Sequence, residues 1–363
     1  MRADRAGGRS GLRVGMRCDA GTQIGVGHLI RCVALAEELV SRGVDVVFLG
    51  DLGGMAWALR QLSSRGLPLL PAPAEPEALL DLVRRRHLRA VVLDGYSLPA
   101  HSGAALRAGG LRVLAVVDGS FGLDQEADLY LDQNPGAADR LQTFPRAASP
   151  DGGAQALAGL RFALLRDLVR ERRPPSAPPP RRQPAVPSVL AVFGGTDPHG
   201  AAAQVVPLLL ATGRPLTVTV VAGRPETAAT LSGLPTAESQ RITVSPPLDD
   251  LPAAARVADL VVTAAGSSVW ELLCLGTPTA VVCVTDNQEV GYRHVIAQRL
   301  AAPVGVLGEL RALDPGARRA AVRVLDGLLS DPSARAELAA RGWAQVDGRG
   351  RERVSDALLA GLE

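Results

Sequence analysis

The chain has 363 residues, a length that favours two domains. Its net charge is only +2 and 47% of its residues are hydrophobic, so two cores can be filled and nothing requires a nucleic-acid or membrane partner. All of its 39 Lys and Arg positions are arginine. The lack of lysine excludes a Schiff-base enzyme, a pyridoxal-phosphate enzyme and a P-loop of the form GxxxxGK[ST].

The first 13 residues are rich in arginine and glycine and lack the apolar segment of a secretory signal, so we expect a disordered extension there. No apolar run reaches the roughly 18 residues that span a bilayer. Four cysteines occur without CxxC spacing, which indicates buried thiols in a reducing compartment. We therefore expect a cytoplasmic protein with no membrane insertion.

Residues 14–171 alternate short apolar runs with helical patterns, which predicts βαβ units and a parallel sheet in a first domain. The predicted strands are 12–16, 44–50, 90–94, 111–118 and 129–132, and the predicted helices are 32–39, 54–65 and 75–87. Residues 172–187 hold a run of prolines that neither a helix nor a central strand accommodates, and are expected to form an extended interdomain linker.

The same alternation restarts in residues 188–345, which predicts a second doubly wound domain, and 346–363 is expected to form a C-terminal helix. The predicted strands are 188–193, 216–222, 242–244, 260–263 and 279–284, and the predicted helices are 199–212, 248–258, 266–275, 289–300, 315–343 and 350–362. The predicted fold is α/β: two Rossmann-like domains facing across a cleft, as in the GT-B architecture.

A glycine loop, Gly25–Arg31, lies between the first predicted strand and the first helix. This order places His28 at a helix N-terminus, at the sheet edge where open α/β folds bind ligands. Because histidine titrates near neutrality, His28 is a candidate general base. The alternative is a helix cap or a histidine whose hydrogen bonds are satisfied structurally.

Two aspartates followed by glycine, Asp94 and Asp118, end neighbouring βα units. Each is expected either to orient His28 or bind sugar hydroxyls, or else to serve turn chemistry. Further candidates for substrate binding lie in the polar turn and the helix start near the first strand. They are Arg17, Asp19, Gly27 and Arg31, of which the two arginines could offset diphosphate charge.

Two glycine-containing turns in the second half are candidate phosphate sites. The first comprises Gly194, Gly195 and Thr196, and it is equally consistent with a tight turn that binds nothing. The second comprises Gly266, Ser267 and Ser268, with Glu271 in the following helix. Glu271 is expected to bind a ribose diol or, alternatively, to form a capping box with Ser268.

The polar residues Asn287 and Gln288 follow the strand 279–284 and suit a uridine or sugar contact, or simply an N-capped turn. No cluster of acidic, histidine or cysteine residues has metal-ligand spacing. We therefore expect neither a metal nor a cofactor.

Seven segments together resemble the UDP-sugar hydrolase family of pseudaminic acid biosynthesis and its spore-coat polysaccharide relatives, a GT-B family related to the lipid II glycosyltransferase. They are MRCDAGTQIGVGHLIRCVALA (16–36), LDGY (93–96), VVDG (116–119), LDQNP (131–135), LAGLRFALLRDLV (157–169), VFGGTDP (192–198) and ADLVVTAAGSSVWELLCLGTPTAVVCVTDNQ (258–288). The chain departs from the family at Asp118-Gly119, where members often carry two aspartates.

The resemblance implies a metal-independent enzyme that hydrolyses the anomeric bond of a UDP-linked amino-deoxy sugar and releases UDP. By motif, His28 would activate water and Tyr96, beside Asp94, would support the sugar or the transition state. The second domain would hold UDP through Gly195, Thr196, Ser267, Ser268 and Glu271, with Asn287 and Gln288 near the diphosphate or sugar.

Three alternatives stay open at this point. A GT-B glycosyltransferase would use the same base on a small-molecule acceptor instead of water. A catalytically silent protein would bind the sugar nucleotide without turnover. A nucleotide-sugar 2-epimerase shares the architecture, but no motif here matches it.

Overall fold

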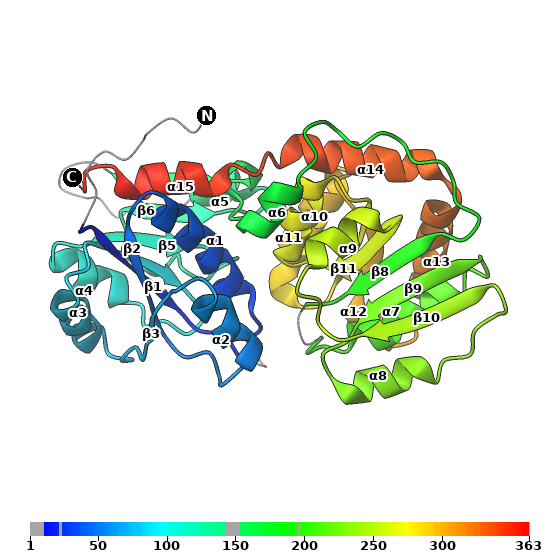
Figure 1. Cartoon of the computed structure of the whole chain (residues 1–363), viewed down its shortest axis with the longest axis horizontal. Helices are drawn as coiled ribbons and strands as arrows, with labels where there is room; N and C mark the ends of the chain where they lie inside the picture. Colours follow the sequence, from blue (N-terminus) through cyan, green and yellow to red (C-terminus); the bar gives the residue numbers. More distant parts are fainter. Residues whose placement is uncertain (1–10, 22–23, 143–152, 195–196, 363) are drawn as a thin grey trace. The chain divides into compact units, whose positions relative to one another are not determined.

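The computed structural model describes residues 11–21, 24–142, 153–194 and 197–362 (Figure 1). The chain divides into two compact units, of which unit 1 comprises Met1–Asp167 and Gly348–Glu363 and unit 2 comprises Leu168–Asp347. Each is a doubly wound α/β domain, so the predicted fold of two Rossmann-like domains is confirmed. Most of the expected extension, residues 1–10, lies outside the described residues.

Unit 1 contains a parallel sheet whose described strands follow the order β3-β2-β1-β4-β5-β6-β7. They are β1 (Arg13–Cys18), β2 (Asp45–Leu49), β3 (Leu69–Leu70), β4 (Ala90–Asp94), β5 (Arg112–Val116), β6 (Leu129–Asp132) and β7 (Gln155–Ala158). The chain order reverses between β1 and β4, where Cys18 lies opposite Asp94. In open α/β sheets this switch point creates the ligand-binding crevice at the carboxyl ends of the strands.

Helices cover both faces of this sheet, so its strands are buried and rich in Val and Leu. The helical elements are α1 (Gly27–Ser41), α2 (Ala56–Ser63), α3 (Pro76–Arg85), α4 (Ser102–Ala108), α5 (Ala137–Gln142), η1 (Leu160–Phe162) and α15 (Gly350–Leu359). One apolar core lies between the sheet and α1, α2 and α15, and a second lies beneath α3 and α4.

Unit 2 repeats this arrangement with described strands in the order β10-β9-β8-β11-β12-β13, all parallel. They are β8 (Ser188–Val192), β9 (Leu216–Val221), β10 (Gln240–Ser245), β11 (Leu260–Ala264), β12 (Thr279–Cys283) and β13 (Ala302–Val306). The helices are α6 (Asp167–Arg172), α7 (Ala201–Leu210), α8 (Pro225–Ser232), α9 (Leu251–Val257), α10 (Ser268–Leu275), η2 (Asp286–Gln288), α11 (Glu289–Ala297), α12 (Leu307–Arg311), α13 (Pro315–Ser330) and α14 (Pro332–Gln345). The switch point lies between β8 and β11.

The long helix expected over 315–343 is two helices, because Asp331 precedes a proline and takes an extended conformation. Its carboxylate accepts hydrogen bonds from the backbone N–H groups of Ser333 and Ala334 at 2.8 and 3.2 Å, and so starts α14. Strands β3, β7 and β13 were not predicted, since they are short or lack a continuous apolar run.

The proline-rich segment 172–187, expected to be an extended interdomain linker, is grouped with unit 2 and holds no helix or strand between the end of α6 and the start of β8. Arginine and glutamine side chains attach it to that unit, because prolines leave no N–H groups for a sheet. Arg173 donates to the carbonyl of Trp343 at 2.8 Å, and Gln183 donates to the carbonyl of Leu329 at 2.9 Å. The guanidinium of Arg173 also lies over the Trp343 ring.

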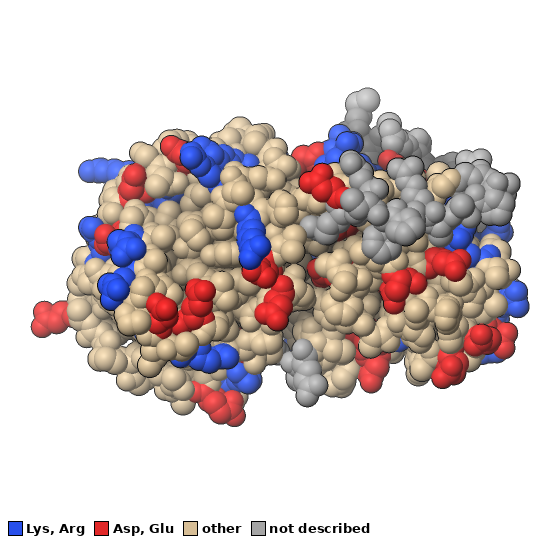
Figure 2. Space-filling model, turned by 180° about the vertical axis from the view of Figure 1, so that it is seen from behind, with Lys and Arg blue, Asp and Glu red and all other residues tan. Residues whose placement is uncertain are grey.

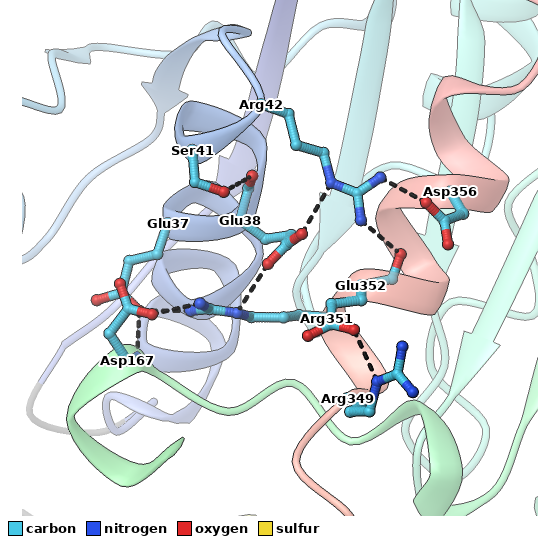
Figure 3. A network of polar contacts seen from close by, with 9 residues as sticks. All are labelled: Glu37, Glu38, Ser41, Arg42, Asp167, Arg349, Arg351, Glu352 and Asp356. Carbon is cyan, nitrogen blue, oxygen red and sulfur yellow. Dashed lines mark hydrogen bonds and ion pairs between the residues drawn. The ribbon is translucent and has the colours of Figure 1, made fainter. Parts of the chain in front are cut away.

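Helix α15 returns to unit 1 and packs beside α1 (Figure 1). A network of ion pairs fixes it there (Figure 3). The buried Arg351 of α15 contacts Glu37 of α1 at 3.0 Å, Glu38 at 3.2 Å and the carboxylate of Asp167. Arg42, at the end of α1, joins Glu38 to α15 from a second side. The two carboxylates of α1 are therefore neutralised by arginines.

Charged side chains on the outer surface are mixed in sign. Figure 2 shows acidic and basic side chains interspersed over the described part of one face. Within the described ranges, no helix combines the length and apolar character needed to cross a membrane.

Replacing Arg351 by Met should destabilise unit 1 by about 1–3 kcal/mol, since it removes the buried cation that Glu37 and Glu38 share and leaves each of them with one other arginine, Arg65 and Arg42 respectively. Urea denaturation followed by circular dichroism measures the change. The matched control is Arg349→Met, which removes a neighbouring but exposed arginine paired with Glu352 and should cost less than about 1 kcal/mol. Equal effects of the two substitutions would contradict the assigned role of Arg351.

Candidate functional site

The switch point of unit 1 holds a buried cluster built around the carboxylate of Asp94. Asp94 ends β4 and is 0% exposed, and His28 and Arg31 reach it from the first turns of α1. His28 Nδ1 lies 2.6 Å from Asp94 Oδ1, and Arg31 donates through Nε to Oδ2 at 2.6 Å and through Nη2 to Oδ1 at 2.5 Å. The structure therefore brings together three of the residues predicted for the site.

The charges in this cluster stabilise one another. Burial opposes ionisation of Asp94, but the Arg31 guanidinium and His28 outweigh it and hold the pKa of this carboxyl well below its usual range. Burial likewise opposes the charge on Arg31, while Asp94 and Asp118 raise the pKa of its guanidinium above the ordinary value. Asp94 is therefore an anion at every physiological pH.

The position of Asp94 assigns the tautomer of His28. An ionised carboxylate at 2.6 Å from Nδ1 can only accept, which favours a proton on that nitrogen, and Arg31 Nη2, 2.9 Å from the same nitrogen, then donates to Asp94 Oδ1 instead. Nε2 consequently carries the lone pair and is the atom able to accept a proton. An oriented imidazole backed by a carboxylate is the arrangement used for general-base catalysis.

Tyr96 and Asp118 extend the cluster outward from His28. The Tyr96 ring packs edge-on against the imidazole, with ring centroids 4.3 Å apart and an interplanar angle of 81°. Its hydroxyl donates to Asp118 Oδ2 at 3.2 Å, and Arg31 Nη1 reaches the same oxygen at 3.3 Å. Burial and the Asp118 carboxylate raise the pKa of Tyr96 well above its usual range, so the phenol is a hydrogen-bond donor.

The other candidates of unit 1 serve different contacts. Arg17 pairs with Asp19 at 2.8 Å, and the Asp19 carboxylate accepts a hydrogen bond from the Asp51 backbone at 2.9 Å. These contacts brace the ends of β1 and β2, and no described hydrogen bond joins either residue to His28. Gly27 is the first residue of α1.

In unit 2, the turn after β8 leads to a helix whose N-terminus is already occupied. Gly194 has a positive φ of 75°, while Gly195 and Thr196 lie outside the described residues. The Asp197 carboxylate accepts hydrogen bonds from the N–H groups of Ala201 and Ala202 at 2.8 and 3.0 Å. The α7 terminus therefore has an internal anion on its first N–H groups.

The turn after β11 ends differently, because the side chain of Ser267, the N-cap residue of α10, makes no capping hydrogen bond. Ser267 precedes the helix and its hydroxyl makes no capping hydrogen bond, while Ser268 is the first helical residue. The capping box considered for Ser268 and Glu271 is thus not the cap of this helix. Glu271 is buried in the first turn. A helix start of this kind offers backbone donors and a positive dipole to an anion.

The segment after β12 lies next to this helix start. Gln288 accepts a hydrogen bond from the Val284 backbone at 3.2 Å, and its amide nitrogen lies 3.6 Å from where a Cβ on Gly266 would be. Asn287 accepts a hydrogen bond from the Thr285 hydroxyl at 2.6 Å. The structure therefore brings Gly266 and Gln288 together, as the predicted nucleotide site requires.

Two residues near the cluster of unit 1 were missed by the sequence analysis. The ring of Phe121 lies 4.5 Å from that of Tyr96, and the thiol of Cys32 lies 3.5 Å from Asp94. Phe121 stands alone in a loop, so no periodic pattern marks it. Within the described residues, no group of three or more His, Cys, Asp or Glu side chains is arranged to hold a metal ion.

No known protein family and no curated protein is matched by this sequence. Solved structures are similar in fold. MurG of Acinetobacter baumannii has a TM-score of 0.67 at 20% identity, over 96% of this chain and 99% of that one. UDP-GlcNAc 2-epimerase from Neisseria meningitidis bound to UDP-GlcNAc has a TM-score of 0.62 at 12% identity, over 96% of this chain and 100% of that one. The calicheamicin glycosyltransferase CalG4 has a TM-score of 0.60 at 16% identity, over 98% of this chain and 99% of that one. The chain therefore has the two-domain GT-B fold.

Asp94→Asn should reduce stability most near neutral pH, because it removes the carboxylate charge that lies closest to the buried Arg31 guanidinium and leaves that guanidinium with Asp118 at 3.3 Å. An aspartate in the unfolded chain titrates near 3.9, whereas the folded-state pKa of Asp94 lies below that range. Its contribution is therefore complete above about pH 5 and is lost as pH falls through the interval between the two values. Urea midpoints measured down to about pH 2.5 should show the gap between wild type and Asp94→Asn narrowing in acid. Asp45→Asn, at an exposed surface pair, is the control and should show no such narrowing.

Proposed function

We propose that this protein is a metal-independent UDP-sugar hydrolase that releases UDP from a UDP-linked amino-deoxy sugar. The observation that carries the proposal is the buried His28–Asp94 pair at the switch point of unit 1, with Tyr96 against the imidazole. The motif resemblance to the pseudaminic acid pathway hydrolases and the GT-B fold support the same class of substrate.

In the proposed reaction, His28 Nε2 removes a proton from water as the water oxygen attacks C1 of the sugar. The bond between C1 and the diphosphate oxygen breaks, and its electron pair leaves with UDP. Asp94 stabilises the imidazolium that forms. Direct displacement inverts the configuration at C1, and no acid is needed for the leaving group because a diphosphate is already stable as an anion.

Unit 2 supplies the proposed nucleotide site. At the start of α10, with Gly266, Ser267 and Ser268, the N-cap side chain makes no capping hydrogen bond, and the backbone N–H groups there would bind the diphosphate and stabilise the charge on the departing UDP. Glu271 would hold the ribose, with Asn287 and Gln288 beside the diphosphate or sugar.

A glycosyltransferase is the second candidate, because CalG4, a similar structure, is a glycosyltransferase. An acceptor hydroxyl or amine would take the place of water, and the same His28 would accept its proton. The two candidates differ in one observable: a hydrolase releases UDP without any acceptor.

The purified protein should release UDP and free sugar from at least one member of a panel of UDP-sugars, in EDTA and without an acceptor. The panel includes 2,4-diacetamido-6-deoxy sugars. His28→Ala should abolish release while retaining affinity for UDP, because it removes the base and leaves unit 2 intact. His101→Ala, at an exposed position before α4, is the control. Binding of UDP without release from any donor would favour the transferase.

Glu271→Ala should weaken UDP binding by about 1–3 kcal/mol, the value of a lost hydrogen bond to a charged group. Calorimetric titration with UDP measures the loss, and thermal melting reports whether the variant is folded. Glu289→Ala, an exposed acid in the first turn of α11, is the matched control. Unchanged affinity would remove Glu271 from the nucleotide site.

A further inference from the structure

Two aromatic rings beside the base cluster of unit 1 are half-exposed. Tyr96 is 36% exposed and Phe121 is 37% exposed, and their ring centroids are 4.5 Å apart at an interplanar angle of 52°. Tyr96 also contacts the His28 ring. The three rings thus form a continuous row from the buried imidazole outward to Phe121. We call Tyr96 and Phe121 the aromatic pair.

The exposure of Phe121 is fixed by its backbone. Asp118 and Phe121 exchange two backbone hydrogen bonds of 3.1 Å, which close a tight turn through Gly119 at a φ of 64°. The following Gly122 has a φ of 81°, and a Cβ there would lie 2.2 Å from the Val116 carbonyl oxygen. Only glycine fits at this position, so the backbone is constrained directly after Phe121 as well as within the turn.

A single exposed phenylalanine needs no explanation in itself. Here the ring lies next to a polar cluster, in which the Asp118 carboxylate accepts hydrogen bonds from the Tyr96 hydroxyl and from Arg31. Apolar surface next to a few convergent polar groups is typical of a small-molecule site. A sugar has this same dual character, since its hydroxyls require polar partners while one face of its ring presents C–H groups.

We infer that Phe121 is a sugar-binding and specificity residue, and that the aromatic pair receives a C–H face of the sugar attached to UDP. The inference rests on the proposed function and specifies its substrate. The sugar is a pyranose whose side facing Phe121 carries C–H or methyl groups, because a hydroxyl pressed against the ring would lose its hydrogen bonds to water.

The experiment measures affinity in the His28→Ala background, so that no turnover interferes. The probes are UDP and the members of the UDP-sugar panel, and the quantity is the sugar advantage, defined as the Kd of UDP divided by the Kd of the tightest-binding UDP-sugar. Phe121→Ser should lower the sugar advantage about tenfold and leave the Kd of UDP unchanged. A tenfold change corresponds to about 1.4 kcal/mol.

Two further variants separate the ring from other effects. Phe121→Tyr keeps the aromatic surface and should retain the sugar advantage, which distinguishes a sugar contact from a folding defect. Leu59→Ser removes an exposed apolar side chain of α2 and should change neither affinity.

The outcomes distinguish this inference from the proposed function. An unchanged sugar advantage in Phe121→Ser would overturn the inference, as would an equal loss of UDP affinity or a panel in which no UDP-sugar binds more tightly than UDP. If the wild type releases UDP in any of these cases, the hydrolase proposal still stands. A sugar advantage that depends on Phe121, together with no UDP release without acceptor, would support the sugar site and reject the hydrolase.

Discussion

The buried carboxylate of Asp94 is the constraint on which the first unit depends. A carboxylate and a guanidinium removed from water each incur a large desolvation cost, and close pairing with further hydrogen bonds is what offsets it. The pairing of Asp94 with Arg31 and His28 therefore requires the first turns of α1, which follows β1 in the chain, to lie beside the carboxyl end of β4 at the switch point of the sheet. The same contacts orient the imidazole, so one interaction serves both the fold and the chemistry we propose.

The two units share a topology but differ in how their helix starts are satisfied. In unit 2, Asp197 supplies a carboxylate to the first N–H groups of α7, whereas the side chain of Ser267, the N-cap residue of α10, makes no capping hydrogen bond. A carboxylate at a helix start stabilises the helix and repels a second anion. For this reason we propose the diphosphate at the start of α10. In unit 1, negative and positive side chains are paired around a histidine, which suits proton transfer.

Alternating apolar runs were sufficient to predict two doubly wound domains, because parallel strands buried on both faces have an unmistakable Val- and Leu-rich pattern. They were insufficient where tertiary contacts decide the structure: the proline-rich segment 172–187 is bound by side chains such as Arg173, and Asp331 ends a helix that periodicity alone would continue. For the site, strand ends correctly grouped His28 with Asp94. They did not indicate Phe121, whose position depends on a turn that only glycine at 122 permits, nor the carboxylate partners of Arg31.

The discontinuous chain of unit 1 has a consequence for the order of synthesis. Glu37 and Arg351 are separated by 314 residues, so a ribosome adding about 5–20 residues per second needs roughly 15–60 s between them. Throughout that interval the two acidic side chains of α1 can pair with Arg42 and Arg65 but lack the arginine that they share, and the whole second unit is synthesised before Arg351 is added. The helix that carries the proposed base therefore reaches its final packing last, although it is translated first.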